Sequence, residues 1–263
     1  MVMASVDQQL LRDLDLRREL FSDEYTILPL AEQEMLVLIK DNTTAISRGV
    51  AILVTDSGIP LASKQGLSPL VKQLTGLGWV TVLVSSPPSD LFQPAEEIMA
   101  PTSDTSAPSA RGSVSPLNQQ VLDKHLQRLS LMMQAVLTKA KEYPGFVLVI
   151  AQGTSAASLT QLYTENKLTA PDALVVIDPY WPNRQLNNQL ATFLASTPMP
   201  VLDIYSKQSN YWSQANIQAR KVAAIKALKL HYRQREIIGV ELFQQPATYL
   251  SKEIYGWLNH MGW

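Results

Sequence analysis

The stretch FVLVIAQGTSAASL, residues 146–159, decides the fold of this chain. Its first part, Phe146–Ile150, is an unbroken apolar run, which is typical of a strand buried on both faces. Small residues follow, and the helical pattern that begins among them continues to Tyr163. A buried strand that turns within a few small residues into a helix is the repeating unit of a parallel sheet.

The same unit recurs on both sides of this stretch. Further strands are expected at residues 35–39, 50–54, 79–84, 173–177, 200–205 and 232–240. Helices are expected at residues 67–77, 117–142, 186–194, 214–228 and 248–260. Apolar strands that alternate with amphipathic helices predict a doubly wound α/β fold, with a mostly parallel sheet and helices on both faces. Only a polar turn separates the first two strands, so we expect them to be neighbours in the sheet.

The chain divides into an N-terminal helical segment, residues 1–30, and a single α/β domain, residues 31–263. Leucine spacing between Ser5 and Leu20 predicts the helix. An insertion at about residues 87–116, rich in Pro, Ser and Ala, interrupts the domain. Such a composition buries too little apolar surface to offset chain entropy, so we expect a mobile loop that is either a lid or disordered.

Composition excludes several classes of function. The 263 residues carry a net charge of −1, whereas nucleic-acid binding needs many Lys and Arg contacts to phosphate. The absence of Cys rules out disulfides, thiol nucleophiles and Cys-ligated zinc, and three His argue against a multi-histidine metal site. No apolar run reaches the roughly 20 residues of a membrane span. We therefore expect no metal, cofactor, nucleic acid or membrane span, and a small molecule, glycan or protein as partner.

Three further stretches carry a resemblance to a known family. They are RGVAILVTDSG at residues 48–58, the segment 70–84 around Leu77-Gly78-Trp79, and PVLDIY at residues 200–205 with the tail IYGWL at residues 254–258. With them, the chain from about Glu32 onward resembles the α/β-hydrolase fold, and more narrowly the bacterial family called domain of unknown function 3530.

The resemblance implies export to the bacterial envelope, and hence a periplasmic or exported protein whose leader has been removed. Residues 1–5, MVMAS, have neither the basic nor the apolar region of a secretory signal. The sequence alone therefore leaves a cytoplasmic location open.

The turn after Ile150 has the composition of a nucleophile elbow, and two registers of the Gly-x-Ser-x-Gly pattern are possible. Counted from the end of the strand, Gly153 takes the nucleophile position and has no side chain that can attack. Shifted by two residues, Ser155 becomes the nucleophile. We favour the first register, because the elbow residue directly follows the strand, and interpret Ser155 as a helix cap.

The acid of a triad has one candidate, Asp178, which follows the strand at residues 173–177; a turn cap is the alternative role. Asp203 falls inside a strand, where a buried carboxylate needs a partner to offset its desolvation. We therefore interpret Asp203 as part of a salt bridge or a backbone hydrogen bond.

The base is missing from its expected place. A hydroxyl nucleophile is weak until a neighbouring base, usually His, takes its proton. The loop that follows the last strand, residues 241–247, contains no His. The three histidines, His125, His231 and His260, are interpreted as surface or packing residues.

Binding groups remain at the carboxyl ends of the strands, where ligands gather in such sheets. Ser57 and Gly58 take the place of the oxyanion loop, and the helix that begins at Gly153 and Thr154 offers free N–H groups for an anion or a carbonyl oxygen. The aromatic residues expected on the same rim, where they either bind a ligand or fill the vacated site, are Tyr180, Trp181, Tyr211 and Trp212.

The segment 218–236 is locally basic. Its cations are Arg220, Lys221, Lys226, Lys229, Arg233 and Arg235. We interpret them as a solvated helix face, with Ile217, Val222, Ile225 and Leu228 turned toward the core. An anionic polymer or lipid surface is the alternative partner for these cations.

Together these observations favour a degenerate α/β-hydrolase-like protein that acts by binding in the bacterial envelope. One alternative is a serine esterase or amidase that uses Ser155, Asp178 and a non-standard base. The other is a scaffold or assembly component that docks a partner protein.

Overall fold

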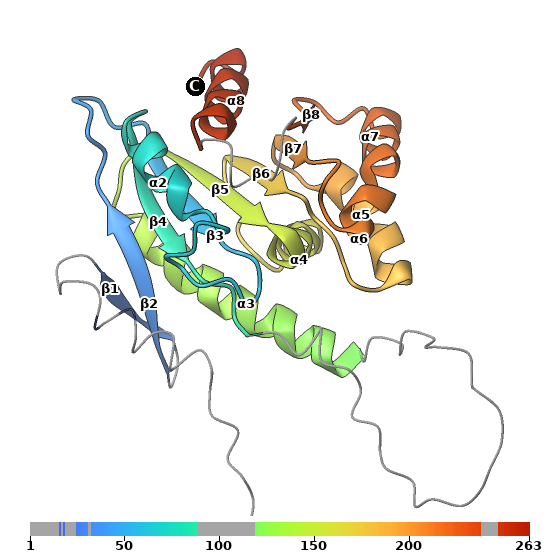
Figure 1. Cartoon of the computed structure of the whole chain (residues 1–263), viewed down its shortest axis with the longest axis horizontal. Coiled ribbons are helices and arrows are strands. Elements are labelled where there is room, and N and C mark those ends of the chain that lie inside the picture. The colour runs from blue at the N-terminus through green and yellow to red at the C-terminus, as the bar shows by residue number, and fades with distance from the viewer. Residues whose placement is uncertain (1–15, 17, 19–24, 31–32, 89–118, 238–246) are drawn as a thin grey trace, which may run out of the picture.

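The computed structural model describes residues 16, 18, 25–30, 33–88, 119–237 and 247–263. Its centre is one eight-stranded sheet (Figure 1). The strands are β1 Thr26–Leu30, β2 Gln33–Lys40, β3 Gly49–Val54, β4 Trp79–Val84, β5 Phe146–Gln152, β6 Ala173–Ile177, β7 Val201–Tyr205 and β8 Arg233–Glu236.

The strands lie in the order β1-β2-β4-β3-β5-β6-β7-β8. The pairs β1–β2 and β2–β4 are antiparallel, and every pair from β4 to β8 is parallel. The expectation that the strands at residues 35–39 and 50–54 are neighbours is wrong, because β4 lies between β2 and β3. The chain leaves β3, passes through helix α2 and returns parallel to β3 on the side that faces β2.

Helices cover both faces of the sheet, as the fold class predicted. They are α2 Ser68–Thr75, α3 Gln119–Ala140, α4 Gly153–Thr164, α5 Arg184–Ser196, α6 Tyr211–Ala215, α7 Ile217–Lys226 and α8 Ala247–His260. Alternate residues of β3 show the two layers: Val50 and Ile52 pack with the α3–α4 side, whereas Ala51 and Leu53 pack with the α2–α8 side. This is the two-residue period of a strand buried on both faces.

Several predicted boundaries need correction. The segment expected to be helical up to residue 30 includes β1, which forms the antiparallel edge of the sheet. The single helix expected at residues 214–228 is two helices, α6 and α7, which break at Asn216. The insertion at residues 87–116 lies outside the described residues except for Pro87 and Pro88, as do most of residues 1–24 and all of 238–246.

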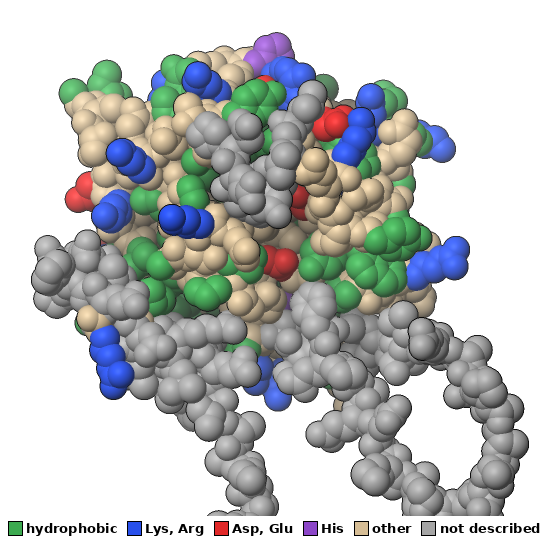
Figure 2. All heavy atoms as spheres, in the orientation of Figure 1, with side chains coloured by type: hydrophobic (Ala, Val, Ile, Leu, Met, Phe, Trp, Pro, Cys, Tyr) green, Lys and Arg blue, Asp and Glu red, His purple; other side chains and the backbone are tan. Residues whose placement is uncertain are grey.

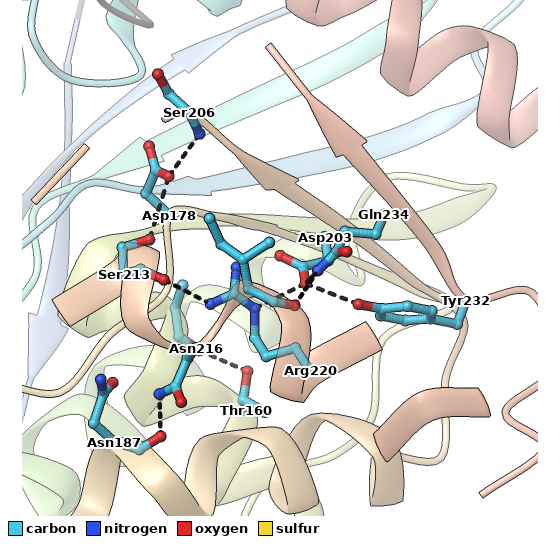
Figure 3. Close-up of polar contacts among 12 residues, drawn as sticks. Thr160, Asp178, Asn187, Asp203, Ser206, Ser213, Asn216, Arg220, Tyr232 and Gln234 are labelled. Carbon is cyan, nitrogen blue, oxygen red and sulfur yellow. Dashed lines mark hydrogen bonds and ion pairs between the residues drawn. The ribbon is translucent and has the colours of Figure 1, made fainter. Parts of the chain in front are cut away.

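A fully buried ion pair joins α7 to the sheet (Figure 3). Arg220 Nε donates to Asp203 Oδ2 over 2.8 Å, and both side chains are completely buried. Tyr232 and Gln234 each donate to the same oxygen over 2.9 Å. The interpretation of Asp203 as one half of a salt bridge is therefore confirmed, and the placement of Arg220 on a solvated face is wrong.

Substituting Arg220 tests this anchor. In Arg220→Met, buried Asp203 loses its ionic partner, which is expected to cost about 3–5 kcal/mol of unfolding free energy in urea denaturation. The neighbouring exposed Lys221→Met is the control, with an expected change within about 0.5 kcal/mol. Equal stability of the two variants would contradict an anchoring role for Arg220.

Candidate functional site

The sharp turn from β5 into α4 is centred on Gly153. Gln152 is still extended, with φ −119° and ψ 144°, and Gly153 has a φ of +60°. A positive φ at the residue after the strand is the strained geometry of a nucleophile elbow, which glycine adopts at no steric cost. The turn therefore has the shape of an elbow, but the residue at its tip carries no side chain.

The carboxyl group of Asp56 fills the space above Gly153. A Cβ atom built on Gly153 would lie 2.1 Å from Asp56 Oδ2 and 2.3 Å from Asp56 Cγ, far inside van der Waals contact. Asp56 follows β3, the strand that pairs with β5, so the carboxyl ends of both strands meet at this point. No larger residue fits at position 153 while Asp56 keeps this position.

Asp56 Oδ1 accepts three hydrogen bonds. The donors are Thr154 N–H at 2.9 Å, Thr154 Oγ1–H at 2.6 Å and Ser57 N–H at 2.8 Å. In an α/β-hydrolase the oxyanion hole consists of the N–H after the nucleophile and an N–H of the loop after β3. Thr154 and Ser57 hold those two positions, so a carboxylate of the chain itself occupies the place of the oxyanion. The N–H groups expected to be free are engaged.

The same carboxylate also caps α4. Gln152 makes no side-chain cap bond, so the first N–H groups of α4 would otherwise lack a partner within the chain. Burial raises the pKa of Asp56 above its ordinary value, while the hydrogen bonds from Thr154, Ser57 and Ser155 oppose that shift. Burial likewise raises the pKa of Tyr180, and its hydrogen bond to Asp56 adds to the rise. Tyr180 therefore stays protonated beside the carboxylate.

Ser155 does not face the surface. Its side chain is completely buried, and its Oγ donates to the backbone carbonyl of Thr55 over 2.9 Å. This hydrogen bond ties the first turn of α4 to the end of β3. The shifted register, in which Ser155 attacks a substrate, would need this serine to leave its buried site.

Asp178 is buried at the end of β6 and has a φ of +45°. Its Oδ1 accepts from Ser206 N–H at 3.0 Å and from Ser213 Oγ at 3.3 Å (Figure 3). Burial raises the pKa of Asp178 to about 6, although these hydrogen bonds and the charge of Arg220 act in the opposite direction. Through these contacts, Asp178 links the end of β6 to the loop after β7 and to α6.

A serine–histidine contact that sequence reasoning missed lies in the core. His125 Nε2 of α3 is 3.3 Å from Ser158 Oγ of α4, and both side chains are buried. Ser158 Oγ also donates to Thr154 O at 2.7 Å within its own helix. The pair joins α3 to α4, and its burial keeps a substrate from reaching it.

The four aromatic residues expected on the rim separate into two kinds. Trp181 is completely buried, and its backbone N–H donates to Asn187 Oδ1 at 2.9 Å, so its ring is not exposed to a ligand, whereas the alternative of a filling role agrees with its burial. Tyr211 is exposed at the start of α6 and meets Trp212 edge to face, with ring centroids 6.0 Å apart. Tyr180 and Trp212 are partly buried.

The loop after β3 also reaches the surface. Gly58 is exposed and Ser57 is partly buried, with Ser57 Oγ donating to Pro87 O at 3.2 Å. Among the described residues, no three His, Asp or Glu side chains gather where they could hold a metal ion. Within the same part of the chain, no helix has the length and apolar character needed to cross a bilayer.

Solved structures of very different sequence share this fold. Est1E from Butyrivibrio proteoclasticus gives a TM-score of 0.60 at 10% identity, over 90% of this chain and 98% of that one. A dienelactone hydrolase from Anabaena variabilis gives a TM-score of 0.59 at 13% identity, over 90% of this chain and 96% of that one. The carboxylesterase Cest-2923 from Lactobacillus plantarum gives a TM-score of 0.58 at 11% identity, over 91% of this chain and 97% of that one. At such low identity the likeness is one of fold.

Fold and elbow together define an α/β-hydrolase-like protein. The chain belongs to the family described as protein of unknown function (DUF3530), whose profile matches residues 3–260. The resemblance inferred from the sequence is thereby confirmed. No curated protein matches the chain in sequence.

Substitution of Gly153 tests the packing of Asp56 against the elbow. Gly153→Ala places a Cβ against the carboxyl group, and we expect a loss of about 2–4 kcal/mol in unfolding free energy from overpacking and the positive φ. In an Asp56→Ala background the same substitution should cost at least about 1 kcal/mol less. The control is Gly256→Ala in α8, where nothing lies within 4 Å of the added Cβ. Equal costs of Gly153→Ala in the two backgrounds would contradict the contact.

Asp178→Asn tests the raised pKa. Between the ordinary pKa of 3.8 and about 6, folded Asp178 holds a proton that the unfolded chain releases, so this group's contribution to stability falls as pH rises through that window. Asn keeps the acceptor oxygen and tolerates the positive φ. Relative to the wild type, the variant should therefore gain up to about 3 kcal/mol between pH 4 and pH 8. The exposed Asp41→Asn serves as control, and a difference that is constant with pH would contradict the assignment.

Proposed function

We propose that this protein is a non-catalytic member of the α/β-hydrolase fold that acts by binding a ligand or partner. One observation carries the proposal. The carboxylate of Asp56 lies where a nucleophile side chain would stand and accepts the N–H groups that would otherwise hold an oxyanion. A substrate carbonyl oxygen cannot take those N–H groups while Asp56 Oδ1 holds them.

Three features weigh against serine hydrolysis. The elbow residue Gly153 offers no attacking atom, and Ser155 is buried against the carbonyl of Thr55. The segment between β8 and α8, residues 237–246, contains no His in its sequence. Catalysis by a serine needs both an activating base and a preformed oxyanion site. The segment after the last strand supplies no His as base, and Asp56 occupies the N–H groups of the oxyanion site.

The rim above the elbow supports binding. Exposed Tyr211 and partly buried Trp212 form an aromatic pair at the start of α6, and Ser57 and Gly58 lie on the loop after β3. Aromatic rings of this kind stack on sugar rings or pack against apolar groups. A glycan, a small acyl compound or an extended segment of a partner protein matches this chemistry. A place in the bacterial envelope, implied by the family resemblance, belongs to the same proposal and is tested by cell fractionation.

The second candidate function is a serine esterase that uses Ser155. The fold shared with a carboxylesterase and a dienelactone hydrolase favours it. It requires α4 to rearrange so that Ser155 Oγ leaves Thr55 and reaches solvent. Asp178 would then serve as the acid, and the base would come from a group other than a histidine after the last strand.

A fluorophosphonate probe discriminates the two functions, because it forms a stable adduct only with an activated serine. We expect no adduct on the wild-type chain by intact-mass measurement, and the same result for Ser155→Ala. An active serine hydrolase in the same reaction is the positive control. A stoichiometric adduct on Ser155, lost in Ser155→Ala, would refute the non-catalytic proposal and establish the esterase.

A further inference from the structure

Helix α7 turns apolar side chains outward. The exposed fractions are 43% for Val222, 61% for Ile225, 84% for Leu228 just past the helix, and 79% for Leu230. We call these four residues the α7 apolar face. The expectation that Val222, Ile225 and Leu228 pack on the core is wrong, because the buried positions of α7 are Arg220 and Ala224.

The backbone at the end of α7 is strained, and the strained residue, Leu228, does not bury its side chain in the fold. Leu228 has a φ of +50°, and the next N–H, that of Lys229, bonds back to Ala224 O at 3.0 Å. Helices that end in this way normally have glycine at the residue with positive φ. A leucine there pays the steric cost of that conformation and buries almost nothing. Such an outlier points to a role outside the fold of the isolated chain.

The surroundings of this face are cationic. Residues 179–235 contain eight Lys and Arg and one acidic residue, Asp203. Of these cations, Arg220 is buried against Asp203, while Lys207 and Arg235 pair with Glu236 and Glu253. Lys221 and Lys226 are exposed on α7 itself. Lys and Arg side chains project from the part of the surface that carries α7, at the upper right of Figure 2. Because the whole chain has a net charge of −1, this positive charge is a local property.

We propose that the α7 apolar face binds the surface of a bilayer that contains anionic phospholipids. Apolar side chains ringed by Lys and Arg are the arrangement that lies in the plane of a membrane interface, with the apolar atoms at the acyl boundary and the cations at the phosphates. A soluble polyanion would satisfy Lys221 and Lys226 but leave Leu228 and Leu230 in water. A second copy of the chain would bring the same cations against each other.

The surface is distinct from the elbow at Gly153. On the inner side of α7, the ion pair between Arg220 and Asp203 fixes which side of the helix faces the sheet. Binding of lipid through this face therefore requires no change at Asp56. The inference stands or falls independently of the proposed non-catalytic function.

Co-sedimentation with vesicles tests the proposal. The full chain is mixed with vesicles of phosphatidylcholine alone, or of phosphatidylcholine with phosphatidylglycerol, at low ionic strength. We expect binding to the anionic vesicles only, and a loss of at least about tenfold in partitioning for the double variant Leu228→Gly, Leu230→Ser. Because glycine suits the positive φ at position 228, the melting temperature should be unchanged or higher with Leu228→Gly alone. Lost binding is then not lost folding.

Matched controls come from elsewhere on the surface. Ile46, at the same 79% exposure as Leu230, lies before β3, and Ile46→Ser should bind as the wild type does. Lys221→Glu with Lys226→Glu should weaken binding, whereas Lys64→Glu with Lys72→Glu, both exposed near α2, should weaken it less.

Four outcomes would overturn the proposal. They are no binding to anionic vesicles, an equal loss with Ile46→Ser, binding that survives the leucine variant but not Lys221→Glu with Lys226→Glu, and a dimer in solution that the leucine variant dissociates. The third outcome would show that Lys221 and Lys226 bind the phosphates without the apolar face, and the fourth would assign the face to a second copy of this chain.

Discussion

The contact between Asp56 and the first turn of α4 holds the carboxyl edge of the sheet together. β3 and β5 are neighbours in the parallel sheet, so the loop after β3 and the start of α4 must meet. Asp56 supplies the acceptor that the N–H of Thr154 needs, and Gly153 supplies the space that the carboxylate needs. Each residue makes the other possible, because a side chain at position 153 would displace the carboxylate and uncap the helix.

This arrangement keeps the geometry of an elbow while filling the space it would use for chemistry. The positive φ of Gly153 and the small residues of α4 preserve the sharp turn. Electrostatic catalysis depends on donors aimed at the place where charge develops in the transition state. Here those donors already bond to a carboxyl oxygen of the chain, so these hydrogen bonds stabilise the fold. Under the proposed function, a ligand binds over this rim and is not transformed.

A second buried carboxylate, that of Asp203 in β7, fixes the position of α7 on the sheet. Asp203 requires a cation in the core, and Arg220 supplies it from α7. The helix positions that face inward are thereby Arg220 and Ala224, which leaves Val222 and Ile225 to point toward solvent. One ion pair thus determines both how α7 docks and which of its side chains are presented outside.

The sequence was sufficient to predict every strand except β1, most of the helices and the place of Gly153, because apolar runs and helical spacing are local signals. Strand order was only partly predictable, since nothing between Lys40 and Gly49 indicates that β4 inserts between β2 and β3. The role of Asp56 was missed, although its position directly after β3 was a usable signal, because its partner lies nearly a hundred residues away. The inward orientation of Arg220 was missed because a basic residue in an amphipathic pattern predicts exposure. Its burial could be predicted only by knowing that Asp203 lies beside it in the fold.

Nuclear magnetic resonance across a pH series tests the central claim most directly, through the carboxyl carbon of Asp56 and the amide protons of Thr154 and Ser57. We expect the carboxyl group to titrate above the ordinary pKa of an aspartate, with both amide protons shifting in the same step. In Asp56→Ala that step should vanish from both amides. An ordinary pKa for Asp56, with the amides of Thr154 and Ser57 insensitive to its ionisation, would show that the carboxylate does not occupy the oxyanion hole.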